Sequence, residues 1–380
     1  MNIQRHIDLL STLKKKSVFL FGPRQTGKTW LIRQLFSQHR VYNLLESDTY
    51  VTLNRAPQRI REECALSPDK IVVIDEVQRL PELLNEVHWL IEEKGIRFLL
   101  TGSSARKLRR SGVNLLGGRA HVQHLHPFSF CELQSQFDLL RAVNYGLLPS
   151  VYLSDTPDEN LQDYLGLYLR EEIAAEGLTR NLPAFSRFLE IAGLCNGKII
   201  NYTKIANDAQ VARTTIHEYF QILKDTLLLF ELPAWNKTIK RKPITTSKYY
   251  LFDAGVTRKL QHRSLIQLGS PEFGEAFESV IFHELKTFVD YVAGCSLSYW
   301  RSTTGLEVDF ILGDMTAIEV KASAAISAHD LKALSMLREE KKLKHYLVVC
   351  SEKEPRMVDG IHILPWRIFL EKLWQGQWVK

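Results

Sequence analysis

The chain has 380 residues, of which 45% are hydrophobic, and its formal net charge at pH 7 is +6. This length is enough for two or three domains with sizeable cores, and the composition excludes a mainly disordered protein. The mild positive charge permits binding to nucleic acid but does not require it.

Localisation signals are weak in this sequence. No run is apolar for long enough to cross a bilayer, and residues 1–16 lack the apolar core of a signal peptide. The five cysteines are scattered and form no C-x-x-C pair, which favours reduced thiols over a zinc site or a disulfide framework. We therefore expect a cytoplasmic protein that does not interact with a membrane.

The first predicted strand, residues 17–21, runs into a glycine-bounded loop and then a helix. The loop, residues 22–29, reads GPRQTGKT and matches G-x-x-x-x-G-K-[ST], which wraps the phosphates of ATP or GTP. Its backbone N–H groups would converge on an anion at the positive end of the helix. We expect Lys28 to reach the terminal phosphates and Thr29 to ligate Mg²⁺; a chance match in a turn is the alternative. The candidate nucleotide-binding residues here are Gly22, Pro23, Arg24, Gln25, Thr26, Gly27, Lys28, Thr29 and Trp30.

A second motif follows the apolar run of residues 71–74, which predicts a central parallel strand. Asp75 ends this strand and is expected to hold the water shell of Mg²⁺. Glu76 is then placed to polarise the water that attacks the γ-phosphate. This second acid favours ATP hydrolysis over a GTPase switch. The alternative is a surface acidic pair at the start of the next helix.

The next predicted strand, residues 97–101, closes on Gly102, Ser103 and Ser104. We expect Ser103 to face the γ-phosphate, whereas a serine N-cap for a helix over residues 105–108 is the competing interpretation. Strand–helix alternation between residues 17 and 125 predicts an α/β fold with a doubly wound parallel sheet. In such a sheet the nucleotide lies at the carboxyl ends of the strands.

These three motifs, in this order, resemble the AAA-type ATPases of the P-loop superfamily over residues 1–170, an ATPase domain with a helical extension. The resemblance implies ATP and Mg²⁺ as cofactors. It also implies an arginine that reaches the ATP site of a neighbouring subunit, and hence a homo-oligomer. Arg119 is the candidate, just before a predicted strand at 120–125. Its competitors are Arg106, Arg109 and Arg110, and a solvated basic face is the alternative.

Residues 171–262 are predicted to form a winged-helix-like domain. Residues 202–223 read as a short helix, a tight turn and an amphipathic helix, and two strands follow at 227–235 and 248–252. The second helix would present polar residues to DNA, and the loop between the strands would contact phosphates. The alternative is a domain used for packing or subunit contact. The residues expected at DNA are Arg213, Thr214, Thr215 and His217 on the helix, and Lys237, Lys240, Arg241 and Lys242 on the loop.

The last region, residues 263–380, carries charged residues on a predicted helix over 273–288 and on two strands joined by a turn at Gly313–Asp314. Alternation puts Glu307, Asp309 and Ile311 on one face of the first strand. On the second strand, Glu319 and Lys321 share a face in the same way.

This pattern resembles the PD-(D/E)-x-K phosphodiesterase core. The resemblance implies that Asp309 and Glu319 hold Mg²⁺, that Glu278 completes the shell, and that Lys321 orients or activates the attacking water. Val308 stands in place of the proline of that motif, which leaves open a DNA-binding or structural module. Surface ion pairs between the acids and the lysine are the plain alternative.

An ATPase domain, a winged helix and a nuclease-like region together resemble a large prokaryotic ATPase family. We expect an ATPase that acts on DNA. Two alternatives remain open: a metal-dependent DNA endonuclease gated by ATP, and a non-catalytic assembly or signalling ATPase whose later domains bind protein.

Overall fold

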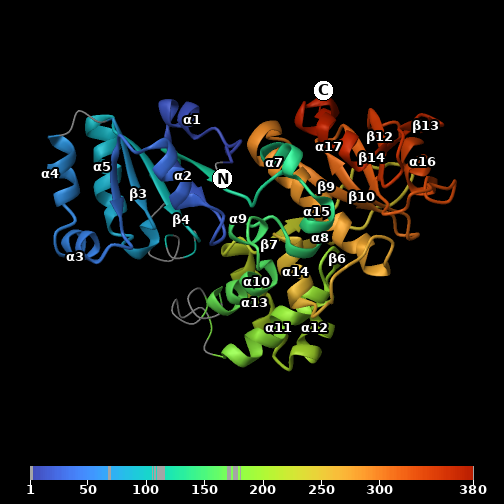
Figure 1. Ribbon diagram of the computed structural model, residues 1–380, viewed down its shortest axis with the longest axis horizontal. Helices are drawn as coiled ribbons and strands as arrows, with labels where there is room; N and C mark the ends of the chain where they lie inside the picture. The colour runs from blue at the N-terminus through green and yellow to red at the C-terminus, as the bar shows by residue number, and fades with distance from the viewer. Residues whose placement is uncertain are drawn as a thin grey trace. The chain divides into compact units, whose positions relative to one another are not determined.

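The structure is a computed structural model, and its described part has several internal gaps. It describes residues 3–66, 70–104, 106, 108, 116–168, 173, 179 and 181–379. Contacts divide the chain into two compact units, which we treat separately (Figure 1). The first unit comprises Gln4–Pro127 and Asp225–Leu227, and the second comprises Met1–Ile3, Phe128–Lys224 and Leu228–Lys380.

The first unit is built on a five-stranded sheet in the order β2-β3-β4-β1-β5, in which every pair of neighbours is parallel. Apolar residues fill most of β1, β3 and β4, as expected for strands covered on both faces. Figure 1 shows helices on either side of this sheet. The strands are β1 (Ser17–Phe21), β2 (Arg40–Asn43), β3 (Ile71–Asp75), β4 (Arg97–Gly102) and β5 (Ala120–His124).

In the part of this unit that the structure describes, α1 to α5 cover the sheet, and their apolar sides close its core. Phe19 and Phe21 of β1 join Ile74 of β3 and Val87 and Leu90 of a covering helix in one buried cluster. This arrangement confirms the predicted parallel α/β domain. The helices are α1 (Leu9–Lys15), α2 (Lys28–Leu35), α3 (Ser47–Arg55), α4 (Arg59–Ala65) and α5 (Leu83–Lys94).

The first half of the second unit is mainly helical and contains a small antiparallel sheet in the order β6-β8-β7. Gln210, with φ 55°, ends one helix and turns the chain into the next. The helices are α7 (Phe130–Leu133), α8 (Leu139–Tyr145), α9 (Pro149–Tyr152), α10 (Pro157–Leu167), α11 (Leu182–Leu194), α12 (Tyr202–Ala209), α13 (Arg213–Asp225) and α14 (Ala254–Leu260). The strands are β6 (Lys198–Ile199), β7 (Leu229–Leu232) and β8 (Lys248–Leu251).

The second half of this unit is a six-stranded mixed sheet in the order β13-β14-β12-β11-β10-β9. Buried residues of α15 and α17 pack on one face, and those of α16 pack on the other. The helices are α15 (Pro271–Phe288), α16 (Lys332–Arg338) and α17 (Trp366–Trp374). The strands are β9 (Leu297–Arg301), β10 (Glu307–Leu312), β11 (Thr316–Val320), β12 (His345–Cys350), β13 (Arg356–Val358) and β14 (Ile361–Pro365).

Strict alternation along β10 was the wrong expectation. The pairing of β10 with β9 shifts register between Val308 and Ile311, as in a β-bulge. Ile311 therefore joins Val308 in the core under α16, whereas Phe310 and Leu312 belong to the core under α15. An extra residue in one strand reverses the faces of all residues beyond it, so Ile311 does not share a face with Asp309.

No helix among the described residues is both long enough and apolar enough to span a lipid bilayer.

Candidate functional site

The loop after β1 has a backbone that only certain residue types adopt. Gly27 has φ 94°, in the region that favours glycine. A Cβ added to Gly22 would lie 2.5 Å from the carbonyl oxygen of Leu125, so any side chain there would displace the backbone at the end of β5. The two glycines of the motif are thus required by the geometry of the loop.

Lys28 begins α2 and points back into the loop. Its buried Nζ donates to the carbonyl oxygens of Gly22 and Pro23 over 2.7 and 3.0 Å. Thr26 Oγ1 also donates to Pro23 O, over 2.9 Å. The ammonium group is therefore held by the same segment whose backbone N–H groups would face an anion.

The strand order brings the second motif to the first. Because β4 lies between β1 and β3, the ends of these three strands meet at one edge of the sheet. Thr29 Oγ1 donates to Asp75 Oδ2 over 3.0 Å, and Thr101 Oγ1 donates to the other oxygen, Asp75 Oδ1. A hydroxyl and a carboxylate are oxygen ligands of the kind Mg²⁺ prefers. Thr29 and Asp75 therefore fit a magnesium ion held beside the phosphate loop.

Glu76 leaves the end of β3 in a left-handed conformation, with φ 61° and ψ 46°. Its N–H donates to Thr101 Oγ1 over 3.2 Å, and its Oε2 accepts a hydrogen bond from Gln78. Burial raises the pKa of Glu76 above its ordinary value, and the charge of Lys28 opposes this rise. Non-glycine residues with positive φ are uncommon and often lie at functional sites. This side chain is thus held at the edge of the sheet, near the lysine of the loop.

Ser103 and Ser104 have different hydrogen-bond partners in the structure. Ser103 is buried beside the site, where its Oγ accepts a 3.4 Å hydrogen bond from Gln78 Nε2. Ser104 Oγ instead accepts from the N–H of Arg106 over 3.0 Å and donates to Asp225 O over 3.0 Å. Ser104 therefore bonds to two backbone groups, one two residues away and one in the distant Asp225.

The arginine candidates also differ in their surroundings. Arg119 lies at the start of β5, where its side chain is 38% exposed and pairs with Glu92. Arg106 is largely enclosed and pairs with Asp225 over 3.1 Å. Arg109 and Arg110 lie outside the described residues.

Three contributors to this site carry no motif and escaped the sequence analysis. Arg5 is buried and donates to the carbonyl oxygens of Thr26, over 2.7 Å, and of His126, over 2.6 Å. Thr101 connects the two acids, and Gln78 connects Glu76 to Ser103. A polar residue at a strand end was a usable signal for Thr101. Nothing in the sequence around Arg5 indicates its contact with the loop.

In the second unit, the end of α12 and the first turns of α13 present polar side chains. Arg213, Thr214 and His217 are exposed, and Thr215 is half-buried. The ring of His217 stacks on Tyr202 of α12 with centroids 3.9 Å apart. The opposite side of α13 is buried through Ile216 and its apolar neighbours, as the amphipathic pattern predicted.

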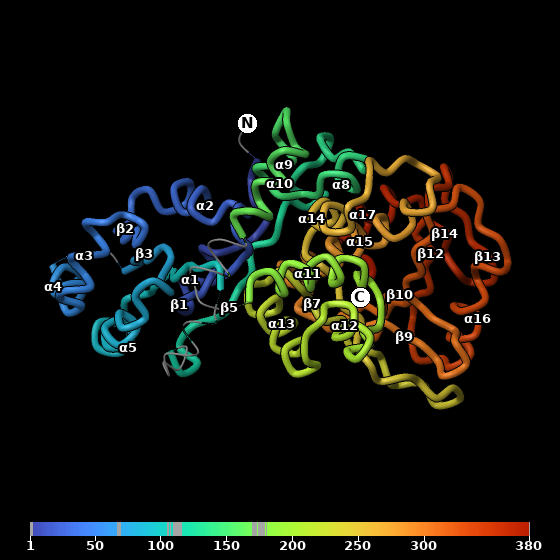
Figure 2. Tube along the Cα trace, turned by 90° about the horizontal axis from the view of Figure 1, so that it is seen from below, coloured from blue at the N-terminus to red at the C-terminus, as the bar shows by residue number. Residues whose placement is uncertain are grey.

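The loop of residues 233–247, which we call the basic arm, corrects one expectation. The arm runs beside β9, with isolated bridges from Ala234 to Tyr299 and from Pro243 to Ser302 (Figure 2). Lys237 pairs with Asp314 over 2.6 Å. Lys237, which was expected to contact DNA phosphates, therefore lies beside a carboxylate of the same chain.

Arg241 of the basic arm is held in the same way. It pairs with Glu339 over 2.6 Å and donates to Met336 O over 2.9 Å. Glu340 Oε2 accepts from the backbone N–H groups of Ile239 and Lys240 over 2.8 and 3.1 Å. The arm is thus fastened to the end of α16. Its exposed cations are Lys237, which pairs with Asp314, and Lys240 and Lys242.

The acids of the C-terminal sheet lie in a buried, charged environment. Asp309 Oδ2 accepts from Val320 N over 2.8 Å, and Lys321 Nζ donates to Glu319 Oε1 over 2.7 Å. Burial, with the nearby Asp309 adding to it, raises the pKa of Glu278 to about 7 and that of Glu319 well above its ordinary value. Glu319 Oε2 is buried without a hydrogen-bond partner.

These carboxylates do not form the expected metal shell. Among the residues that the structure describes, no three His, Cys, Asp or Glu side chains come together so that they could hold a metal ion. Glu278 instead accepts a 2.5 Å hydrogen bond from Tyr250 OH. Glu278, Asp309 and Glu319 thus do not fit a shared Mg²⁺ ion in this arrangement.

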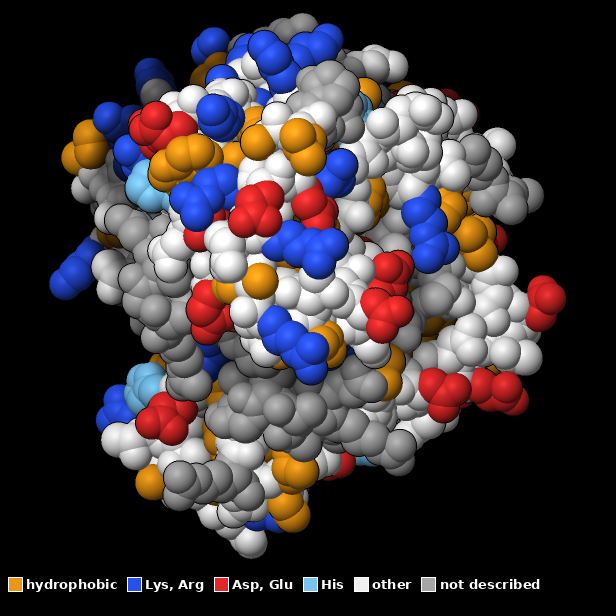
Figure 3. All heavy atoms as spheres, turned by 90° about the vertical axis from the view of Figure 1, so that its left-hand side faces the viewer, with side chains coloured by type: hydrophobic (Ala, Val, Ile, Leu, Met, Phe, Trp, Pro, Cys, Tyr) orange, Lys and Arg blue, Asp and Glu red, His pale blue; other side chains and the backbone are white. Residues whose placement is uncertain are grey.

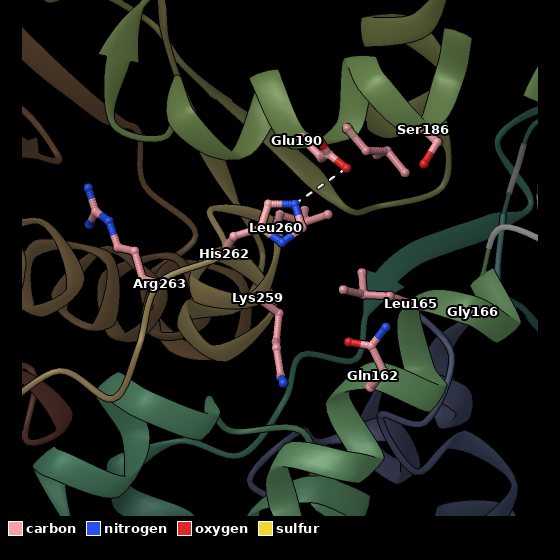
Figure 4. A pocket seen from close by; sticks show the side chains of 10 residues that line it. Gln162, Leu165, Gly166, Ser186, Glu190, Lys259, Leu260, His262 and Arg263 are labelled. Atoms are coloured by element: carbon pink, nitrogen blue, oxygen red, sulfur yellow. Dashed lines mark ion pairs between the residues drawn. The ribbon is translucent and has the colours of Figure 1, made fainter. Parts of the chain in front are cut away.

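A separate pocket of about 400 Å³ opens between α10, α11 and the end of α14 (Figure 4). Its lining includes Glu190, Lys259, His262 and Arg263, and His262 Nε2 lies 3.4 Å from Glu190 Oε1. Lys259 is paired outside the pocket with Asp158. None of the site residues predicted from the sequence lines this pocket, so it adds nothing to their chemistry.

The face shown in Figure 3 mixes basic, acidic and hydrophobic side chains. Among the described residues visible there, neither sign of charge forms a single broad area. Such a face gives no indication of a nucleic-acid surface, which needs clustered cations.

The sheet order, the loop and the paired acids define the class of the first unit. Residues 14–134 match the family model described as "AAA domain", and the first unit is accordingly an ATP-binding domain of AAA type. Residues 136–267 match "Domain of unknown function (DUF8612)", and residues 273–369 match "Domain of unknown function (DUF4143)".

Relatives extend over most of the chain. The "Uncharacterized protein Rv2008c" of Mycobacterium tuberculosis is 25% identical over 320 residues, which cover 82% of this chain and 71% of that protein. The "Uncharacterized protein MJ1637" of Methanocaldococcus jannaschii is 22% identical over 418 residues, covering 94% of this chain and 85% of that protein.

Two solved structures are distantly similar. "Replication initiator DnaA bound to AMPPCP and single-stranded DNA" is 13% identical, with a TM-score of 0.28 over 59% of this chain and 90% of that chain. "Crystal structure of protein VC1899 from Vibrio cholerae" is 11% identical, with a TM-score of 0.22 over 95% of this chain and 97% of that chain. At these TM-scores the likeness supports no conclusion about this chain.

Proposed function

We propose that the chain binds ATP with Mg²⁺ at the loop of residues 22–29 and hydrolyses ATP at an interface between identical subunits. The single observation that carries this proposal is the 3.0 Å contact between Thr29 Oγ1 and Asp75 Oδ2. It brings a hydroxyl and a carboxylate together beside a loop shaped for phosphates. The loop residues from Arg24 to Gly27 then offer backbone N–H groups to the phosphates, whereas Gly22 and Pro23 contribute the shape of the loop, and Trp30 is an exposed aromatic neighbour.

The proposed roles follow from the chemistry of each group. Lys28 neutralises charge on the terminal phosphates, and Ser103 contacts the γ-phosphate. When bound, Mg²⁺ supplies further positive charge, with Thr29 and Asp75 as the residues that hold it. Glu76 orients the attacking water and accepts its proton, a role suited to a carboxylate with a raised pKa.

Arg119 completes the site of a neighbouring subunit in this proposal. A guanidinium group stays charged and spreads its donors over several phosphate oxygens. The partial exposure of Arg119 supports this choice, whereas Arg106 is enclosed by its pair with Asp225. The chain would therefore hydrolyse ATP only as an oligomer.

Mixing two inactive variants tests the subunit interface. Lys28→Ala removes the ATP site but keeps the arginine, and Arg119→Ala does the reverse. We expect each variant alone to be inactive and their mixture to regain part of the ATPase rate. A mixture as inactive as its components, although it assembles to the native mass with an ATP analogue, would place the arginine role elsewhere.

We further propose that α12 and α13 bind DNA. The order helix, strand, two helices and two strands, with sheet order β6-β8-β7, supports a winged-helix arrangement. Arg213, Thr214 and His217 are exposed on α13, the helix that would contact base edges in the major groove. An ATPase assay with and without DNA, on protein of known mass in solution, tests the link between the two activities.

One observation favours a second candidate, an assembly or signalling ATPase whose later regions bind protein. Lys237 and Arg241 of the basic arm are committed to carboxylates of the same chain, which weakens an arm-based DNA contact. Gel shifts separate the two candidates, because phosphate contacts are strongest at low salt. Absence of any shift at low salt would favour the assembly function. The endonuclease alternative has no support from a metal shell.

A further inference from the structure

Lys248 of β8 is an unusual lysine, because only 4% of its surface is exposed. A buried ammonium group is costly unless opposite charges surround it. Lys248 Nζ pairs with Glu307 of β10 and lies 5.2 Å from the ring centroid of Tyr299 of β9. β8, a strand of the small sheet, thus places a buried ammonium group beside Glu307 of β10, a strand of the C-terminal sheet.

A second side chain of β8 reaches the same group of acids. Tyr250, two residues after Lys248, donates its hydroxyl to Glu278 Oε1 over 2.5 Å and stacks on Phe282 at 4.2 Å. Glu278 and Phe282 both belong to α15. β8 therefore connects, through one ammonium and one hydroxyl, to two of the three elements that carry the acids, β10 and α15.

The electrostatics agree with this geometry. Burial disfavours a charged lysine, yet the carboxylates of Glu278, Asp309 and Glu307 keep the pKa of Lys248 above its ordinary value. Burial raises the pKa of Glu278 and Asp309, and Lys248 opposes this rise at both. The charge of Lys248 thus acts on both acids in the direction that its position beside Glu307 predicts.

Two further protein cations pair with acids of this group. Arg301 lies 3.2 Å from the second oxygen of Glu307, and Lys321 pairs with Glu319 over 2.7 Å. In a metal-dependent site a divalent ion would supply this positive charge. Among the residues described here, Glu307 and Glu319 pair with side-chain cations, and no three acids come together so that they could hold a metal ion.

We propose that Lys248 is a built-in counter-cation that replaces a divalent metal in this acidic group, which joins β8 to the C-terminal sheet and binds no Mg²⁺. The basic arm strengthens the same joint, because it leads directly into β8 and is fastened to Asp314 and Glu339. The C-terminal region then holds the helices α12 and α13 firmly, without cutting DNA itself.

The first test titrates Mn²⁺ into nucleotide-free, full-length protein and compares it with Asp309→Asn. We expect the two proteins to bind Mn²⁺ equally, because the acidic group takes up no metal. One Mn²⁺ per chain that is lost in Asp309→Asn would overturn the proposal. This comparison needs only the native lysine, so it decides the question even if Lys248 variants do not fold.

The second test removes the internal cation. Lys248→Met keeps the length of the side chain but leaves the acids without their ammonium group. We expect it to melt at a lower temperature, to gain one Mn²⁺ per chain at least roughly tenfold tighter than the native protein, and to recover stability with Mn²⁺. The double variant Lys248→Met/Asp309→Asn should lose the new site.

Lys240→Met is the matched control, since Lys240 is an exposed lysine of the basic arm. It should leave both the melting temperature and Mn²⁺ binding unchanged. If a folded Lys248→Met protein gains no Mn²⁺ site, the ammonium group of Lys248 does not substitute for the charge of a metal ion, and the proposal is wrong.

Discussion

Thr29 donates a 3.0 Å hydrogen bond to Asp75 across 46 residues of sequence. The contact joins the first turn of α2 to the end of β3, and β1, the strand that precedes α2, is separated from β3 in the sheet by β4. Thr101 of the intervening strand β4 bonds to the same carboxylate from its other side. The phosphate loop and the acid motif therefore form one site, on which the following predictions rest.

Removing the loop lysine should abolish nucleotide binding. Lys28→Ala deletes the ammonium group that the loop holds at Gly22 O and Pro23 O, and we expect ATP affinity to fall by at least two orders of magnitude. Titration with a fluorescent ATP analogue measures this loss. Arg33→Ala, an exposed cation on the same helix, is the control and should bind normally. Near-native affinity of Lys28→Ala would refute the assignment.

Glu76→Gln should separate binding from turnover. The amide keeps the shape of the side chain and can still bond to Gln78, but it cannot accept a proton from water. We expect normal ATP binding and a turnover rate lower by about 10²-fold or more, as for loss of a general base. Single-turnover hydrolysis with saturating ATP is the measurement. Unchanged rates would mean that another group activates the water.

DNA binding should depend on α13 more than on the basic arm. Arg213→Ala should weaken binding and reduce the slope of log affinity against log salt by about 1 if the arginine contacts one phosphate. Lys237→Ala is the comparison, because its ammonium pairs with Asp314. We expect Lys237→Ala to change affinity little, as measured by fluorescence anisotropy at several salt concentrations. The reverse ranking of the two variants would move the interface to the arm.

The buried Glu284 should make stability depend on pH. Its oxygens accept hydrogen bonds from Phe130 N over 2.8 Å and from Trp374 Nε1 over 2.9 Å, yet burial raises its pKa from 4.5 to about 8. Between these values the folded protein keeps a proton that the unfolded chain loses. The free energy of unfolding should therefore fall as pH rises through this window, by up to about 1.4 kcal/mol per pH unit.

Thermal melts of Glu284→Gln isolate this contribution. The glutamine does not titrate, so the native protein should lose stability relative to the variant between pH 5 and pH 8. Glu371→Gln, an exposed position on α17, should instead parallel the native protein. Parallel pH profiles for the native protein and Glu284→Gln would show that Glu284 is ionised in the folded state throughout.

Several features were predictable because they depend on residues close together in sequence. The motif at residues 22–29 predicted a glycine-bounded loop between a strand and a helix, and the structure has this loop between β1 and α2, with Gly22 in a close contact and Gly27 at positive φ. The apolar runs predicted the parallel strands β1, β3 and β4 for the same reason, since a strand covered on both faces needs apolar residues throughout.

Other features depended on contacts between distant segments, and no local pattern contains them. The bulge in β10 reversed the face of Ile311, and the basic arm was turned toward Asp314 and Glu339. Arg5 meets Thr26 O only because the folded chain returns to the loop. The sequence by itself determined the class of the first unit, because the motif that defines the loop is encoded in eight consecutive residues. Only the tertiary structure decided the charge environment of the acids at Glu278 and Asp309, because Lys248, whose charge acts on both, comes from another sheet.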